Sequence, residues 1–266
     1  MRIDKKFRTL KAQRKKAFIA YITAGDPSLS MTEKITLALE RSGVDMVELG
    51  IPFSDPLADG PVIQAASLRA LRKGASLKRI FSMVRALRRK TEIPLVFMTY
   101  YNPVLKYGLV KFMKDCKASG VDGVIVPDLP FEEAGELIKN GRVNKVSVIN
   151  LVAPTSTGER IRNIARKSTG FIYYVSLTGV TGARRKLPVE LISRIKAVRA
   201  MTDKPLCVGF GISGPEQAKN IAKFSDGIIV GSAIVKIIEN NLGDTRRLIY
   251  KVSSFSKSLA KAIHGR

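Results

Sequence analysis

The sequence predicts an α/β fold in which eight parallel strands and their helices close into a single (β/α)8 TIM barrel. Eight short apolar segments alternate with helical segments along the 266 residues, and eight such units in roughly 250 residues is typical of this barrel. Polar and apolar residues alternate only weakly within the segments, as in parallel strands that are buried on both faces. No Gly/Ser-rich linker interrupts the chain, so we expect one domain over 1–266. A doubly wound open sheet is the alternative, but it would not require eight units.

Each predicted strand is a run of apolar residues that ends in turn residues. The first strand ends in Gly25-Asp26-Pro27, and the eighth ends in Gly231-Ser232. The eight strands are expected at 18–23, 46–51, 94–101, 123–127, 146–152, 171–177, 206–210 and 227–230.

The predicted helices carry apolar residues at a spacing of three and four. Ser30 and Glu33 fit a capping box after the first strand, and Pro61 suits the first turn of another helix, where a missing N–H costs nothing. Helices are expected at 1–16, 30–43, 61–73, 77–90, 109–118, 132–139, 159–167, 188–200, 215–223 and from 245 onward. The barrel therefore has an extra N-terminal helix and an inserted helix between its second and third strands.

Composition narrows the chemistry. The chain has two cysteines, Cys116 and Cys207, and one histidine, His264, close to the C-terminal end. This pattern argues against a catalytic histidine, a Ser-His-Asp triad and a multi-histidine metal site, and it favours a reducing, cytoplasmic compartment. No apolar run approaches the roughly 20 residues of a transmembrane helix. The basic and apolar N-terminal segment ends in a turn rather than a signal-peptide cleavage site, so we expect no membrane partner.

Two carboxylates in different surroundings mark the second predicted strand and the loop after it. Glu48 interrupts an apolar strand, and burying an ionised carboxylate is costly unless the group is paired or has a raised pKa. Asp59 lies in the Pro-rich loop 52–60, together with Asp55. Asp55 alone is most simply a solvated loop residue, whereas Glu48 and Asp59 together could divide the roles of acid and base.

Functional residues of a barrel lie at the carboxyl ends of its strands and in the loops that follow. Tyr100, Asn102, Asp128 and Tyr173 meet this condition. The seventh and eighth strands run into the glycine-rich segments 209–214 and 231–232, where backbone N–H groups could hold a phosphate. The sequence therefore predicts a phosphorylated small molecule facing two carboxylates, although each glycine loop alone could be an ordinary tight turn.

Residues 47–60 resemble the signature of the tryptophan synthase alpha subunit family. Further matching motifs follow in order at 23–27, 98–103, 127–130, 151–155, 179–182, 209–213 and 231–235. The resemblance covers about 15–240 and implies retro-aldol cleavage of indole-3-glycerol phosphate to indole and glyceraldehyde 3-phosphate. It implies no cofactor on this chain. Indole would pass to a pyridoxal-phosphate-dependent beta subunit in an alpha2beta2 tetramer.

The resemblance also implies roles for individual residues. Glu48 matches the acid/base, Asp59 the carboxylate that binds the indole N–H, and Tyr173 a tyrosine beside the glycerol chain. The substrate-pocket matches are Tyr21, Tyr100, Val126 and Val152, with Thr181 as a closing-loop residue. The phosphate matches are Gly182, Phe210, Gly211, Gly231 and Ser232. The matches near the beta-subunit interface are Pro52, Asp55 and Asn102.

Two features of the sequence depart from the family pattern. Asn150 stands where many relatives have proline or an apolar residue, and 46 basic against 22 acidic residues give a net charge of +24.

Three other functions share parts of this pattern. A stand-alone lyase would share every catalytic residue and release free indole. A sugar-phosphate isomerase would share the glycine loops but not residues 48–59. A polyanion-binding protein without activity would need a defect in that stretch, and there is none.

The basic composition gives a first prediction. Any binding of nucleic acid should be non-specific and lost at moderate salt, because it would rest on release of counterions from phosphates. Titration of a fluorescent single-stranded oligonucleotide at rising NaCl concentration measures this. A sequence-specific, salt-resistant complex would instead support the polyanion-binding function.

Overall fold

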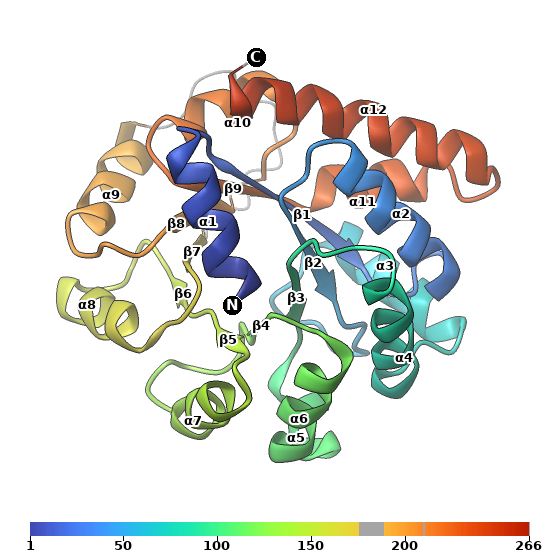
Figure 1. Cartoon of the computed structure of the whole chain (residues 1–266), viewed down its shortest axis with the longest axis horizontal. Coiled ribbons are helices and arrows are strands. Elements are labelled where there is room, and N and C mark those ends of the chain that lie inside the picture. The colour runs from blue at the N-terminus through green and yellow to red at the C-terminus, as the bar shows by residue number, and fades with distance from the viewer. Residues whose placement is uncertain (176–188, 210, 266) are drawn as a thin grey trace.

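The computed structural model describes residues 1–175, 189–209 and 211–265 (Figure 1). Its strands form one parallel sheet in the order β5-β4-β3-β2-β1-β9-β8-β7-β6. The strands are β1 (Ala17–Thr23), β2 (Met46–Gly50), β3 (Leu95–Met98), β4 (Gly123–Ile125), β5 (Ser147–Val148), β6 (Leu151–Val152), β7 (Ile172–Val175), β8 (Leu206–Gly209) and β9 (Gly227–Val230).

The two ends of this sheet belong to one stretch of chain. The strand predicted over 146–152 is divided into β5 and β6 by Ile149 and Asn150. Ile149 N donates to Val124 O at 3.0 Å, and Tyr173 N donates to Asn150 O at 3.2 Å. The same stretch therefore pairs with β4 on one side and with the chain at β7 on the other, so the sheet closes on itself. The predicted (β/α)8 barrel is confirmed, with β5 and β6 as two parts of its fifth strand.

The helices surround this barrel (Figure 1). They are α1 (Arg2–Ala12), α2 (Leu29–Arg41), α3 (Pro61–Arg72), α4 (Leu77–Arg88), α5 (Tyr101–Tyr107), α6 (Leu109–Ser119), α7 (Gly135–Asn144), α8 (Gly158–Lys167), α9 (Val189–Arg199), α10 (Pro215–Ala222), α11 (Ser232–Glu239) and α12 (Thr245–His264). In the described parts of the chain, no helix has both the length and the apolar character needed to cross a membrane.

Several local predictions differ from the structure, among them the bounds of α1, which ends at Ala12, and of β3, which ends at Met98. The N-cap of α2 is Ser28, whose hydroxyl accepts from Met31 N at 3.2 Å, so the predicted capping box at Ser30 is wrong. Helix α7 begins at Gly135 rather than at 132. Helices α5 and α11 were not predicted, because each has at most eight residues and follows its strand with almost no loop.

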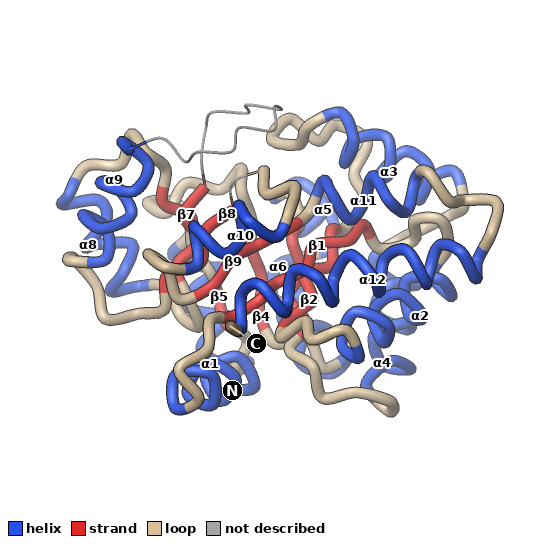
Figure 2. Tube along the Cα trace, turned by 90° about the horizontal axis from the view of Figure 1, so that it is seen from above, coloured by secondary structure: helices blue, strands red, loops and turns tan. Residues whose placement is uncertain are grey.

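Side chains of the strands alternate between two apolar layers. One layer fills the barrel interior, and the other lies between the strands and the surrounding helices. Helix α1 closes one end of the interior with Ile3, Phe7 and Leu10, and the rings of Phe7 and Phe171 lie 5.8 Å apart. Figure 2 shows α1 beneath the strands, whereas α3 and α11 lie toward the other end. The interior is thus sealed at the amino ends of the strands.

Three aspartates at the sealed end hold neighbouring strands together. Each precedes or begins a strand segment and accepts a backbone N–H from the adjacent strand at 2.9 Å: Asp45 from Phe18, Asp122 from Leu95 and Asp226 from Leu206. Each also pairs with a basic side chain, namely His264, Arg88 and Arg199, respectively. The lone histidine therefore has a structural partner, far from the carboxyl ends of the strands.

Helix α1 plugs this end of the barrel, so loss of its buried side chains should destabilise the fold. Phe7→Ala deletes a buried ring that packs on Phe171 and should lower the free energy of unfolding by about 3–5 kcal/mol. Urea denaturation measures the change. Arg8→Ala, on the exposed face of the same helix, is the control and should remain within about 0.5 kcal/mol of the unchanged chain. Equal unfolding midpoints for both variants would contradict the role of α1.

Candidate active site

Glu48 is a carboxylate buried in the barrel. It lies in β2, opposite Tyr21 of β1 in the sheet register, and is 1 % exposed. Neither of its carboxylate oxygens has a hydrogen-bond partner in the described part of the chain. Burial, and secondarily the charge of Asp59, raises its pKa from the ordinary 4.5 to about 8. At neutral pH this side chain therefore holds a proton that it can donate.

Asp59 faces Glu48 from the loop after β2. Its N–H donates to Pro56 O at 3.0 Å, and its carbonyl accepts from Gln64 Nε2 at 2.8 Å, so the backbone around it is held at the start of α3. Burial raises its pKa to about 6, although a hydrogen bond with Tyr100 acts in the opposite direction. At neutral pH, Asp59 is charged while Glu48 is protonated, which is a division of roles between two carboxyl groups.

Two tyrosines from the barrel wall complete this group. Burial raises the pKa of Tyr21 and of Tyr173 well above 10, and Glu48 and Asp59 add to both shifts. Their hydroxyls lie over glycines: a Cβ on Gly50 would lie 2.0 Å from the Tyr21 oxygen, and a Cβ on Gly209 would lie 2.6 Å from the Tyr173 oxygen. Only glycine at these two strand ends leaves room for the rings, a requirement that no local pattern in the sequence reveals.

Tyr100 holds in place the loop 52–60 that carries Asp55 and Asp59, called the acidic loop below. Its hydroxyl accepts from Ala58 N at 2.9 Å, and its ring lies 5.5 Å from that of Phe53. Both partners belong to the loop that carries Asp59. Tyr100, predicted as a pocket residue, therefore also positions the second carboxylate.

The structure places Val126 and Val152, the predicted apolar wall residues, in the layer between strands and helices. Val126 also lines the cavity described next, and the role of both residues in the substrate pocket stays a prediction. Their neighbours Ile125 and Leu151 face the interior instead. Adjacent residues of a strand point to opposite faces, so each pair of neighbours divides between the two layers.

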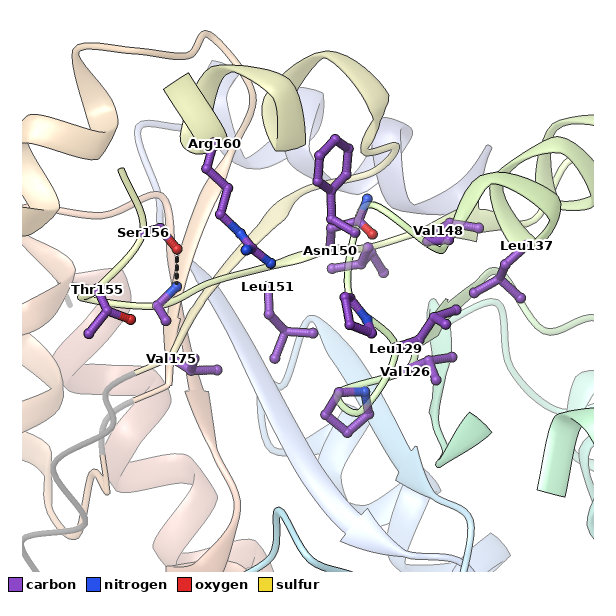
Figure 3. A pocket seen from close by; sticks show the side chains of 16 residues that line it. Val126, Leu129, Leu137, Val148, Asn150, Leu151, Thr155, Ser156, Arg160 and Val175 are labelled. Carbon is purple, nitrogen blue, oxygen red and sulfur yellow. Dashed lines mark hydrogen bonds between the residues drawn. The ribbon is translucent and has the colours of Figure 1, made fainter. Parts of the chain in front are cut away.

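A cavity of about 350 Å³ is lined by residues that follow β4 and by residues of β5, β6 and the loop before α8. Leu151 and Val175 line it and also pack against the interior cluster that contains Tyr173. Figure 3 shows Arg160 reaching toward it from α8. Asn150, the unusual residue of this segment, lines the cavity and donates through Nδ2 to Ser168 Oγ at 2.9 Å.

The ends of β8 and β9 lie side by side, because these strands pair over Cys207–Gly209. Gly211 is exposed and has a left-handed φ of +44°, which favours glycine. Gly231 is the N-cap of α11, and Ser232 is its exposed first residue. The first N–H groups of a helix have no partner within it and attract anions. The other predicted phosphate residues, Gly182 and Phe210, and the closing-loop residue Thr181 lie outside the described residues.

The predicted interface residues differ in accessibility. Asp55 and Asn102 are exposed, in the acidic loop and at the start of α5, whereas Pro52 is buried. Direct contact of Pro52 with a partner is therefore not supported by this conformation. In the ranges that the structure describes, no cluster of three or more His, Cys, Asp or Glu residues could hold a metal ion.

Comparison with known proteins gives a consistent result. The family model described as tryptophan synthase alpha chain matches residues 7–264. The tryptophan synthase alpha chain of Caldanaerobacter subterraneus subsp. tengcongensis is 49% identical over 262 residues, which cover 98% of this chain and 99% of that one. The alpha chain of Geotalea uraniireducens is 50% identical over 246 residues, or 92% of each chain.

Solved structures agree with the sequence comparison. The tryptophan synthase subunit alpha of Legionella pneumophila str. Paris superposes with a TM-score of 0.92 at 39% identity and covers 98% of both chains. A chain of Mycobacterium tuberculosis tryptophan synthase gives a TM-score of 0.89 at 35% identity, again over 98% of both chains.

The raised pKa of Glu48 predicts a cost in stability that depends on pH. From about pH 4.5 to 8 the unfolded chain releases this proton while the folded chain retains it, so rising pH favours unfolding. Glu48→Gln removes the titration. Its free energy of unfolding should equal that of the unchanged chain near pH 4.5 and exceed it increasingly up to pH 8, as measured by urea denaturation.

The control for this measurement is Glu136→Gln, an exposed glutamate of α7, whose difference from the unchanged chain should stay flat with pH. A flat difference for Glu48→Gln as well would show that Glu48 titrates normally.

Proposed function

This chain belongs to the tryptophan synthase alpha chain family, and from this membership we propose that Glu48 and Asp59 carry out its lyase reaction. That reaction is the cleavage of indole-3-glycerol phosphate to indole and glyceraldehyde 3-phosphate. The observation that carries the assignment of residues is Glu48, a buried carboxylate that has no hydrogen-bond partner among the described residues and lies near a second carboxylate of lower pKa.

The proposed chemistry follows from these protonation states. Cleavage of the bond between indole C3 and the glycerol chain requires a proton at C3 and loss of the proton on the adjacent side-chain hydroxyl. Protonated Glu48 supplies the first, and its carboxylate then accepts the second, which returns Glu48 to its initial state. The bonding electrons return to the indole ring as the hydroxyl carbon becomes an aldehyde. Ionised Asp59 accepts the indole N–H and stabilises the positive charge that protonation creates there.

The remaining parts of the site suit the two ends of this substrate. The apolar residues around Tyr173, Leu151 and Val175 offer an environment for the indole ring. The N-terminus of α11, beginning at Ser232, and the backbone at Gly211 offer N–H groups for the phosphate. Tyr173 would lie beside the glycerol chain between these ends.

Membership of the family implies a beta partner. We propose an alpha2beta2 complex in which the partner holds pyridoxal phosphate and receives indole. Asp55 and Asn102 are exposed beside the acidic loop, and a partner that contacts Asp55 would act on the same short loop as Asp59. It could raise activity only through a higher affinity for the active conformation of this loop.

The catalytic assignment predicts two different losses. Glu48→Gln should reduce indole release by roughly 10²–10⁴-fold, because the amide preserves size but cannot transfer a proton. Asp59→Asn should also be severely impaired, because it loses the negative charge beside the indole nitrogen. Indole release from indole-3-glycerol phosphate by the purified chains measures both, with Glu136→Gln as an unaffected control. Near-normal turnover by folded Glu48→Gln would refute the assignment.

Regulation by the partner is tested separately. Titration of a beta subunit should give a saturable rise in indole release, and a tenfold gain needs only about 1.4 kcal/mol of coupling. Asp55→Ala should weaken this response, whereas Asp203→Ala, exposed before β8, should not. High activity without any response to the partner would favour a stand-alone lyase.

A further inference from the structure

Arg69 joins two acidic residues from different parts of the barrel. Its Nε and Nη2 atoms donate to the two carboxylate oxygens of Asp26, both at 2.9 Å. Its Nη1 donates to Oε1 of Glu239 at 3.0 Å. Asp26 is 2 % exposed, so the two-pronged pair is largely shielded from water. An arginine fork holds direction as well as distance, which a lysine ammonium does not.

The three residues come from elements that flank the proposed site. Asp26 follows β1, the strand of Tyr21. Arg69 is on α3, the helix that begins two residues after Asp59. Glu239 is the last residue of α11, whose first residue is Ser232. Helices α3 and α11 pack against each other, as Figures 1 and 2 both show.

The loop that carries Asp26 is itself fixed. Gly25 N donates to Thr32 Oγ1 at 2.9 Å. A Cβ on Gly25 would lie 2.8 Å from the Cβ of Ala75, just beyond α3. Asp26 is therefore held in place and in turn holds Arg69. The hydrogen bond from Arg69 Nη1 to Glu239 then holds α11.

An apolar contact joins α3 to α11 in addition to the ion pair between Arg69 and Glu239. Tyr21, Ala66 and Val235 form a small buried cluster between β1, α3 and α11. Any movement of α11 would thus also change the packing of the Tyr21 ring. With eight residues, α11 is roughly 12 Å long, so a helix held at Glu239 is also held at Ser232.

From this geometry we propose that Arg69 is a positioning residue for the substrate phosphate. It fixes α11, and with it the N–H groups at Ser232, at a set distance from Glu48 and Asp59. The inference rests on the proposed function, which places the phosphate at this helix end. The position of α11 matters because the N–H groups of a helix N-terminus bind an anion only where they point at it.

A purely structural ion pair is the competing explanation, and it makes a different prediction. If Arg69 only stabilises the fold, its replacement lowers the unfolding temperature, but the folded protein binds a phosphate ligand normally. If Arg69 positions α11, phosphate affinity falls even where the protein is fully folded.

The test uses the full chain and glycerol 3-phosphate as the probe, with binding measured by calorimetry below the unfolding temperature of each variant. Glu239→Ala removes the arm to α11, together with the exposed pair of Glu239 with Lys236, and leaves the buried pair of Arg69 with Asp26. It should weaken binding three- to tenfold and raise KM for indole-3-glycerol phosphate similarly, with kcat changed less than about twofold. Arg69→Met should do at least as much, and Arg69→Lys should be intermediate. Arg72→Met, exposed on the same helix, is the matched control and should bind as the unchanged chain does.

Unchanged glycerol 3-phosphate affinity in folded Glu239→Ala would overturn the inference, whatever the loss of thermal stability. Because this variant keeps the Asp26 pair, the result decides even if Arg69→Met fails to fold. Absence of binding by the unchanged chain would overturn the proposed phosphate site together with this inference. Binding by the unchanged chain and by Glu239→Ala alike would overturn the inference alone.

Discussion

A strand in a closed barrel places alternate side chains in the interior and against the helices, and this constraint governs the whole molecule. On β1 and β2 it brings Tyr21 and Glu48 inward together, at paired positions of the register. On β7 it brings Tyr173 inward at the same end. Since the interior is narrow, neighbouring inward positions must be small where large ones meet, and Gly50 and Gly209 meet this need. The proposed catalytic group is thus an outcome of packing as much as of chemistry.

Buried carboxylates have different surroundings at the two ends of the barrel. At the amino end, Asp45, Asp122 and Asp226 each accept a backbone N–H and pair with a basic group. Such fully partnered charges fix strand positions. At the carboxyl end, Glu48 has neither kind of partner in the described chain, and burial shifts its pKa instead. A group left in this condition costs stability, and the compensating benefit is a proton held ready near neutral pH.

The sequence predicted the architecture well, because eight apolar runs and their spacing depend on burial, which leaves a clear pattern. It located Glu48 for the same reason: a charged residue in an apolar run is conspicuous. It does not reveal which residues face inward where polar and apolar residues fail to alternate regularly. In 146–152 the polar residues Ser147 and Asn150 are three positions apart, so nothing local indicates that Leu151 rather than Val152 faces the interior. The in-register partner Tyr173 would have settled this, but register is a property of the closed sheet. The contacts of Tyr100 with Phe53 and Ala58 join distant segments and are likewise absent from any local pattern.

The distribution of fixed and adjustable parts follows from these contacts. The barrel interior and its α1 plug are packed around buried apolar side chains, so Glu48 and the tyrosines have little freedom. Asp59 has more, because its loop is held by Tyr100 and by a few backbone bonds. The proposed phosphate end is held from a third direction, through α11, Arg69 and the anchored Asp26. A substrate that touches all three therefore contacts one rigid element and two that are set by a small number of polar contacts. Those contacts are where a docking partner could alter activity without disturbing the barrel.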